Sequence, residues 1–182
     1  MRKFVFVFSS DKGGSGKSTA SILIGRLLAA SRWRVLVVDL DGRGDTTRYH
    51  LAGRVPPPDR TLAACFEHLD ARSCILPSHI INTDLIAGAP YLPERVRGLP
   101  REMFRDILEP VRDEYDVIII DSPGYIPPIV VSAWSFADKI ITPAGLHGFD
   151  LMGLRNMRAV ITRETNFDLA HWHIFLNGVR DP

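Results

Sequence analysis

The sequence predicts a doubly wound α/β domain with a mainly parallel sheet and helices on both of its faces. Short apolar runs rich in β-branched residues alternate with longer segments in which apolar residues recur at helical spacing. A glycine-rich loop joins the first apolar run to the first helical segment, and carboxylates follow two later runs. The length of 182 residues fits one domain, residues 1–182, with a single core.

The first element is a strand over residues 4–8, because Phe-Val-Phe-Val-Phe is an unbroken run of aromatic and β-branched residues. The helix that follows is expected to bury one apolar stripe, formed by Ala20, Leu23, Ile24, Leu27 and Leu28. Residues 11–19 therefore connect a buried strand to the start of a helix. This is the setting of a phosphate-binding P-loop.

The loop also has the residue types that phosphate binding requires. Glycines let backbone N–H groups approach phosphate oxygens, and the positive end of the next helix adds attraction. Lys17 is expected to reach the β- and γ-phosphates, and the Ser18 hydroxyl to bind Mg²⁺. The other expected nucleotide contacts are Gly13, Gly14, Ser15, Gly16 and Thr19. An ordinary glycine-rich turn does not account for Lys-Ser directly after the last glycine, so a P-loop NTPase fold is expected.

A second buried strand is expected at residues 35–38, followed by Asp39-Leu40-Asp41. The carboxyl ends of parallel strands face the ligand crevice in an open sheet, so these two carboxylates are candidates for a nucleotide site. A charged strand end that caps the next helix through Asp45 or Thr46 would produce the same pattern.

The middle of the chain has weaker signals. Residues 61–69 predict a helix with one apolar face formed by Leu62, Cys65, Phe66 and Leu69, and residues 83–88 predict a strand. A helical segment is expected from about Pro93 to Glu109, with a break at Pro100. It carries the basic cluster Arg95, Arg97, Arg101 and Arg105. Interleaved acidic residues favour a solvated helix face, with an anionic partner surface as the alternative.

Residues 117–120 predict a central strand, because four β-branched apolar residues stand in a row, and Asp121 follows at its carboxyl end. A carboxylate there can hold a Mg²⁺-bound water beside the phosphates, since Mg²⁺ keeps several of its waters. The loop that follows, Ser122-Pro123-Gly124, is expected to respond to the γ-phosphate.

The last third alternates in the same way. A helix is expected at 129–136, a strand at 139–143, a helix at 149–164 and a final strand at 173–176 that leads to Asn177. The apolar stripe of the second helix consists of Leu151, Leu154, Met157 and Ile161.

The composition argues against several classes of protein, including strongly basic nucleic-acid-binding, disulfide-rich and membrane-spanning proteins. A net charge of +1 provides no overall basic field, so any DNA contact would be local. Cys65 and Cys74 form neither a disulfide framework nor a Cys-x-x-Cys metal site. The apolar run after Met1 is too short for a signal peptide, and nothing approaches the roughly 18 apolar residues of a membrane span. A cytoplasmic setting is therefore expected.

Taken together, the motifs of the chain resemble those of a known family. Residues 12–19 resemble the deviant Walker A motif of the ParA/MinD ATPases, which is marked by an extra lysine at the start of the loop, here Lys12. Asp39-Leu40-Asp41 resembles their switch I, and residues 116–123 resemble their Walker B and switch II. Asn177 is similar in position to an asparagine that reads adenine. The resemblance covers nearly the whole chain and is closest to a small plasmid or chromosome partition ParA.

The resemblance implies ATP and Mg²⁺ as cofactors and a slow hydrolysis of ATP to ADP and phosphate. Catalysis would use Lys17, Asp41 to position the attacking water, and Lys12 to reach the partner subunit's phosphates in an ATP-dependent homodimer. Asp39 and Asp121 would serve Mg²⁺ through water. The implied partners are a centromere-binding or other activator protein and non-specific DNA, with no membrane, and a partition protein would associate with the nucleoid.

The sequence departs from the family pattern at three places. Gly42-Arg43 replaces the usual Pro-Gln, Gly124 replaces a proline and predicts a looser loop, and the chain is expected to be C-terminally short because relatives continue beyond Asn177. A nucleotide-gated binding module with little turnover is the alternative function. A small-molecule kinase or ligase is a third hypothesis, which Lys12 disfavours.

Overall fold

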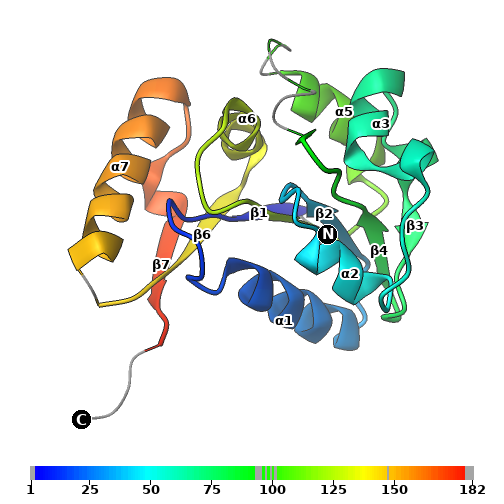
Figure 1. Ribbon diagram of the computed structural model, residues 1–182, viewed down its shortest axis with the longest axis horizontal. Coiled ribbons are helices and arrows are strands. Elements are labelled where there is room, and N and C mark those ends of the chain that lie inside the picture. The colour runs from blue at the N-terminus through cyan, green and yellow to red at the C-terminus, as the bar shows by residue number, and fades with distance from the viewer. Residues whose placement is uncertain are drawn as a thin grey trace.

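The computed structural model describes residues 3–92, 96, 98, 100, 102–146 and 148–178. Within them, a seven-stranded sheet runs through the middle of the molecule (Figure 1). From edge to edge its strands are β3 (Leu76–Pro77), β4 (Thr83–Ile86), β2 (Val35–Asp39), β5 (Val117–Asp121), β1 (Phe4–Phe8), β6 (Lys139–Ala144) and β7 (Trp172–Leu176). β3 is antiparallel to β4, and the other neighbouring strands pair in parallel.

Helices cover both faces of this sheet (Figure 1). One face carries α1 (Lys17–Ala30) and α2 (Asp45–His50). The other carries α3 (Leu62–His68), α5 (Met103–Arg112), α6 (Pro128–Phe136) and α7 (Gly148–Glu164). Short 3₁₀ turns occupy Pro58–Arg60, Arg72–Cys74 and Leu169–His171. The predicted doubly wound, mainly parallel α/β fold is confirmed.

Two apolar cores lie on opposite sides of the sheet, because successive side chains of a strand point to opposite faces. The core under α5, α6 and α7 takes from the strands Val5, Val7, Leu36, Val38, Ile118 and Ile120. The core under α1 takes Phe8, Val35, Val37, Val117 and Ile119. Burial on both sides explains why these strands are unbroken apolar runs in the sequence.

The apolar stripe predicted for α1 is wrong in part. Leu23 and Leu27 are exposed, at 52% and 68%. The line of residues that the sheet buries consists instead of Ser21, Gly25 and Ala29, with Ala20, Ile24 and Leu28 partly buried beside it. Small side chains let the helix lie close to β5, where a Cβ on Gly25 would be 3.4 Å from Ile119 Cδ1.

Two other predicted apolar faces are shorter than expected. α3 ends at His68, so Leu69 takes a left-handed conformation with φ 54° and is exposed. In α7, Met157 and Ile161 are buried as predicted, but Leu151 is exposed. The first turn of α7 directs Asp150 inward in its place, and Asp150 is buried.

The basic cluster lies mostly outside the described residues, which include only Arg105 of its four arginines. Arg105 is exposed on α5, as a solvated helix face requires, and donates to the Ser135 carbonyl at 2.9 Å. α5 begins three residues after Pro100, where a break was predicted. Cys65 and Cys74 are free and buried. In the described part of the chain, no helix combines the length and the apolar character that a membrane crossing requires.

Candidate nucleotide site

The phosphate loop joins the end of β1 to the N-terminus of α1. Gly14 and Gly16 have φ angles of 74° and 97°, a left-handed conformation that glycine adopts without strain. Gly16 is the N-cap of α1 and provides no side-chain cap, so the first N–H groups of the helix are open to an anion. A Cβ on Gly13 or Gly14 would meet nothing within 4 Å, so the front of the loop is open.

Lys17 is buried inside this loop. Its Nζ donates to the Lys12 carbonyl at 3.0 Å and to Ser10 Oγ at 3.3 Å. Burial lowers the pKa of Lys17, and the nearby carboxylates of Asp121 and Asp41 oppose this effect. Its hydrogen bonds within the described chain thus go to neutral oxygens, and the two carboxylates act on the ammonium without a direct ion pair.

The carboxyl ends of β2, β5 and β1 meet at one edge of the sheet. Asp39 and Asp121 are register partners there, next to Phe8, and both are fully buried. Burial raises the pKa of both carboxyls, and their mutual repulsion raises that of Asp39 further. This is the edge at which the predicted nucleotide residues were expected to converge.

The two carboxylates differ in how their oxygens are used. Asp39 Oδ1 accepts from the Asp41 N–H at 3.0 Å, and Oδ2 accepts from the Thr47 N–H at 2.9 Å and its hydroxyl at 2.7 Å. Asp121 Oδ2 accepts from the Thr46 hydroxyl at 2.6 Å. Asp121 Oδ1 is buried and has no hydrogen-bond partner among the described residues. Asp39 thus holds both the loop before α2 and the first turn of α2, whereas Asp121 keeps an acceptor available among the described residues.

The residues around Asp121 fit a magnesium ion held largely through water. Burial raises the pKa of Asp121, whereas the nearby hydroxyls of Thr46 and Ser18 and the charge of Lys17 lower it. The Ser18 hydroxyl and an unpartnered carboxylate oxygen thus lie in the same region as Lys17. Across the described ranges, no three His, Cys, Asp or Glu side chains gather as a metal cage. Few protein ligands are what Mg²⁺ takes at phosphate sites.

Asp41 is held by its neighbour Arg43. The Arg43 N–H donates to Asp41 Oδ1 at 3.0 Å, and Nη2 and Nε donate to Oδ2 at 3.0 and 3.3 Å. The pair faces a hollow of about 380 Å³ whose wall includes Gly13 of the phosphate loop. The predicted water-positioning residue therefore lies in front of the loop, but as part of an ion pair.

Lys12 is tied to α7 of its own chain. Its Nζ lies 3.0 Å from Asp150 Oδ1, and its side chain is 42% exposed whereas that of Asp150 is 4% exposed. Asn156 on the same helix donates to Asp11 at 2.5 Å. These two contacts fasten the start of the phosphate loop to the first turns of α7.

Gly124 packs directly on the phosphate loop. A Cβ at this position would lie 2.8 Å from the Cα and N of Gly13 and 3.0 Å from the carbonyl carbon of Lys12. The Ser122 hydroxyl donates to Ser9 Oγ at 3.0 Å in the same region. Glycine here permits a close backbone contact, so the structure gives Gly124 a packing role where the sequence predicted a looser loop.

Asn177 lies against the base of the phosphate loop. Its Nδ2 donates to the Ser15 carbonyl at 2.8 Å, and its N–H donates to the Ala144 carbonyl at 2.8 Å. A Cβ on Gly16 would collide with the Asn177 amide. The asparagine thus joins the predicted site, and its contact with adenine stays a prediction.

Several residues of the site escaped the sequence analysis. The hydroxyls of Thr46 and Thr47 hold Asp121 and Asp39, and Asp150 holds Lys12. The alternative in which Asp45 or Thr46 caps the next helix is wrong, because the N-cap of α2 is Gly44 and has no side-chain hydrogen bond. The signal available in the sequence was a pair of threonines a few residues after the two aspartates at the end of β2.

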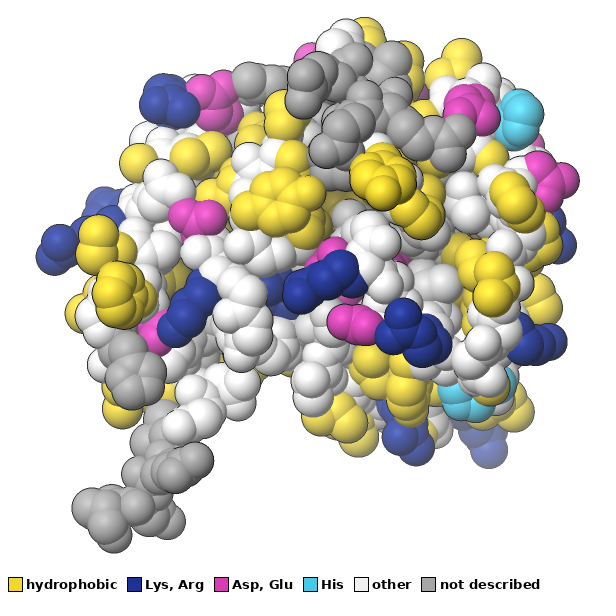
Figure 2. All heavy atoms as spheres, in the orientation of Figure 1, with side chains coloured by type: hydrophobic (Ala, Val, Ile, Leu, Met, Phe, Trp, Pro, Cys, Tyr) yellow, Lys and Arg dark blue, Asp and Glu magenta, His cyan; other side chains and the backbone are white. Residues whose placement is uncertain are grey.

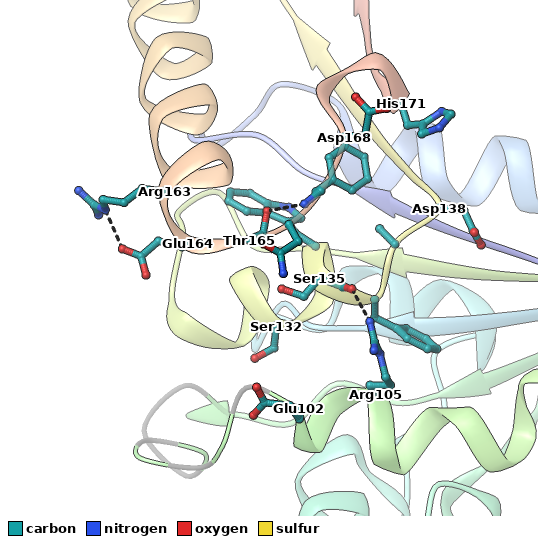
Figure 3. A pocket seen from close by; sticks show the side chains of 15 residues that line it. Glu102, Arg105, Ser132, Ser135, Asp138, Arg163, Glu164, Thr165, Asp168 and His171 are labelled. Atoms are coloured by element: carbon teal, nitrogen blue, oxygen red, sulfur yellow. Dashed lines mark hydrogen bonds and ion pairs between the residues drawn. The ribbon is translucent and has the colours of Figure 1, made fainter.

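A second hollow of about 610 Å³ lies apart from this site, at the ends of α6 and α7 (Figure 3). Its arginines are engaged locally: Arg105 donates to the Ser135 carbonyl, and Arg163 pairs with Glu164 at 2.7 Å. It contains none of the glycine-loop residues. This hollow is therefore separate from the edge formed by β1, β2 and β5.

Comparison with known proteins agrees with this geometry. The AAA_31 family, described as an AAA domain, matches residues 3–170. The virulence plasmid ParA family protein pGP5-D of Chlamydia psittaci is 32% identical over 159 residues, which are 83% of this chain and 60% of that protein. The chain belongs to the ParA/MinD family of P-loop ATPases. It spans about 60% of the length of the C. psittaci relative and of a second curated relative, from Pseudomonas putida.

Solved structures share the ParA/MinD fold. A plasmid partition protein from Borrelia burgdorferi superimposes with a TM-score of 0.85 at 22% identity, covering 100% of this chain and 83% of that one. Cobyrinic acid a,c-diamide synthase from Mycobacterium smegmatis, with bound ATP analog and magnesium, superimposes with a TM-score of 0.79 at 20% identity and covers 95% and 72%. A partition protein and a synthase share this fold, so the choice between them depends on individual residues.

Proposed function

We propose that residues 1–182 form one ATPase domain that binds ATP with Mg²⁺, hydrolyses it slowly, and dimerises with ATP to position or segregate DNA or another large cargo. The observation that carries the proposal is Asp121 Oδ1, which is buried without a hydrogen-bond partner in the described chain. It accompanies a phosphate loop whose following helix, α1, has no side-chain N-cap. A buried carboxylate oxygen is costly unless a cation or water satisfies it. The relatives named as ParA-family and plasmid partition proteins support the proposal that the cargo is DNA or another large assembly.

ATP is the nucleotide that the site would hold. Lys17 would bind the β- and γ-phosphates, and Asn177 would contact the adenine. The backbone contacts would come from Gly13, Gly14, Ser15, Gly16 and Thr19. The ATP analog and magnesium in the M. smegmatis synthase support the same pair of ligands here.

Magnesium would be held at the Asp121 side of the site, by the Ser18 hydroxyl directly and by Asp121 and Asp39 through water. The ion supplies positive charge to the β- and γ-phosphates when bound. Asp121 has a free oxygen for this role among the described atoms, whereas the oxygens of Asp39 already accept three hydrogen bonds. We therefore assign Asp121 a larger part in magnesium binding than Asp39.

Hydrolysis would proceed by attack of a water that Asp41 positions. The water oxygen bonds to the γ-phosphorus, the bond to the bridging oxygen breaks, and ADP leaves with the electron pair while the water's proton passes to the released phosphate. Lys17 and Lys12 stabilise the charge that develops on the phosphate oxygens. Lys12 must first leave Asp150.

Dimerisation is supported by apolar side chains exposed around the site. They are Tyr91, Tyr125, Leu146, Phe149 and Met152, with exposures from 52% to 78%. Figure 2 shows basic and acidic side chains across the middle of one face with hydrophobic ones around them. Such a face suits a second copy of the chain. A centromere-binding or other activator protein, and non-specific DNA on the nucleoid in the cytoplasm, would be the further partners.

The dimer is tested by analytical ultracentrifugation with no nucleotide, ADP, and ATP with Mg²⁺. We expect ATP with Mg²⁺ to raise the dimer fraction. Lys12→Ala should lower the association constant of the ATP-bound dimer by about 10- to 150-fold, because a charge-assisted contact is worth about 1.5–3 kcal/mol. Arg158→Ala, an exposed position on α7, should behave as the wild type. A monomer under every nucleotide condition contradicts the proposal.

The Asp41–Arg43 ion pair favours a second function, a nucleotide-gated binding module with little turnover. Phosphate release, measured with and without DNA and candidate activators, separates the two functions. A module stays at background in every mixture, whereas an ATPase exceeds it.

A further inference from the structure

Arg43 covers the carboxylate that the proposed hydrolysis needs. Its backbone N–H occupies Asp41 Oδ1, and its guanidinium donates twice to Oδ2, at 3.0 and 3.3 Å. The two residues are two positions apart in the turn between β2 and α2, so the contact forms within one short segment. Both oxygens of Asp41 are engaged by this single neighbour.

The ion pair lies where an attacking water would approach. Asp41, Arg43, Gly13 and Gly124 line the same hollow of about 380 Å³ in front of the phosphate loop. Asp41 Oδ2 already accepts two hydrogen bonds, which use both of its lone pairs, so a water directed at a γ-phosphate from this oxygen must first displace Arg43. Oδ2 is the oxygen that the side chain of Arg43 covers, whereas the contact to Oδ1 comes from the backbone N–H, which every residue except proline would supply at position 43.

We propose that Arg43 restrains hydrolysis by holding Asp41, which makes it a positioning residue that acts through Asp41. This inference rests on the proposed function, in which Asp41 positions the water. Release of the guanidinium frees Oδ2 to accept a hydrogen bond from the water. The water then attacks the γ-phosphorus and ADP leaves, with the same bonds formed and broken as in the proposed hydrolysis.

The restraint is weak enough to be reversible. The Arg43 side chain is 67% exposed, while that of Asp41 is 12% exposed. Exposed ion pairs have modest strength and are screened by salt, so loss of this one corresponds to about a two- to fivefold change in rate. The same screening predicts that salt relieves the restraint in the wild type.

The test measures steady-state phosphate release and ATP affinity for Arg43→Ala and Arg43→Lys. We expect Arg43→Ala to raise kcat about two- to fivefold with KM for ATP unchanged. Arg43→Lys keeps the charge but loses the paired donors, so its kcat should be intermediate. Adding salt should raise kcat of the wild type relative to Arg43→Ala.

Arg48→Ala is the matched control. Arg48 pairs with Asp45 at 2.9 Å and is 66% exposed, close to Arg43 in sequence and exposure, but its partner is not Asp41. Its kcat should equal that of the wild type. The double variant Asp41→Ala with Arg43→Ala should be as slow as Asp41→Ala alone, because Arg43 acts only through that carboxylate.

The outcomes separate this inference from the proposed function. A wild type that hydrolyses ATP, with Arg43→Ala unchanged or slower, overturns the restraint and leaves the ATPase standing. Gain of turnover in the double variant overturns it as well. If ATP binds but no variant releases phosphate, the restraint is wrong and the chain is a binding module. If ATP does not bind, the proposed function itself fails.

Discussion

Asp39 and Asp121 are two buried carboxylates on adjacent strands, and their burial opposes folding. It raises the pKa of Asp39 to about 7 and that of Asp121 to about 6, from an ordinary value of 3.8. The folded state therefore binds their protons more tightly than the unfolded state does. The free energy of unfolding is therefore not reduced by these groups below pH 3.8, where both states hold the protons, and it falls as the pH rises to about 7.

Asp121→Asn should therefore stabilise the nucleotide-free protein at neutral and higher pH. The neutral amide removes the buried charge and its Oδ1 can still accept from Thr46, so we expect the free energy of unfolding at pH 8 to rise by about 2 kcal/mol. Urea denaturation at pH 8 and pH 4 measures this, and the difference should shrink at pH 4, where the wild-type carboxyl is protonated. A less stable variant at pH 8 contradicts the prediction. Stabilisation by added Mg²⁺ with ATP should be lost.

α1 is the element whose packing differs most from the pattern in the sequence. Its buried line contains Ser21, Gly25 and Ala29, although Leu23 and Leu27 have the larger apolar surfaces. The helix follows the phosphate loop directly, so the geometry of the loop fixes its start and its rotation. The face that then meets the sheet has room only for small side chains.

Position 25 should respond to side-chain size in both directions. Gly25→Ala places a Cβ at ordinary contact distance from Ile119 and improves helix propensity, so the free energy of unfolding should rise by about 0.5–1 kcal/mol. Gly25→Leu should lower it by about 1–3 kcal/mol through overpacking. Chemical denaturation measures both, with Leu27→Ala as an exposed control that changes little. A stabilising Gly25→Leu would show that the helix is not packed closely.

At the scale of the whole molecule, the site is assembled from segments that are distant in the sequence. Parallel pairing brings the ends of β1, β2 and β5 together, and the loop after β5 rests on the phosphate loop through Gly124 and Gly13. α7 reaches the same loop through the Lys12–Asp150 ion pair. Changes in one loop are therefore transmitted to the others by direct contact.

Gly124→Ala tests this assembly. The added methyl would lie 2.8 Å from backbone atoms of Gly13, which have no side-chain freedom to move away, so the two loops must separate. We expect the free energy of unfolding to fall by about 1–3 kcal/mol. Gly148→Ala, where a Cβ meets nothing within 4 Å, is the control and should be unchanged or slightly more stable. Equal stability of Gly124→Ala and wild type would refute the close contact.

Much of the fold was predictable because its signals are local. Residues 4–8, 35–38 and 117–120 are apolar runs long enough to identify buried strands, and each proved to be one. The helix faces were less predictable, as Leu23 and Leu151 show, because burial depends on which side meets the sheet. The candidate site was predictable in its residue types and its edge of the sheet, but Thr46 and Asp150 were missed because their partners, Asp121 and Lys12, are distant in sequence.

The sequence by itself determined the phosphate loop, the parallel α/β arrangement and the carboxylates at strand ends, since spacing and residue type along the chain encode them. Only the tertiary structure decided how those groups are used. It shows Asp121 with a free oxygen in the described chain, Asp39 fully hydrogen-bonded, Lys12 held by Asp150 and Asp41 covered by Arg43. The physical reason is that hydrogen bonds and ion pairs depend on distances of about 3 Å, which periodicity in a sequence does not specify.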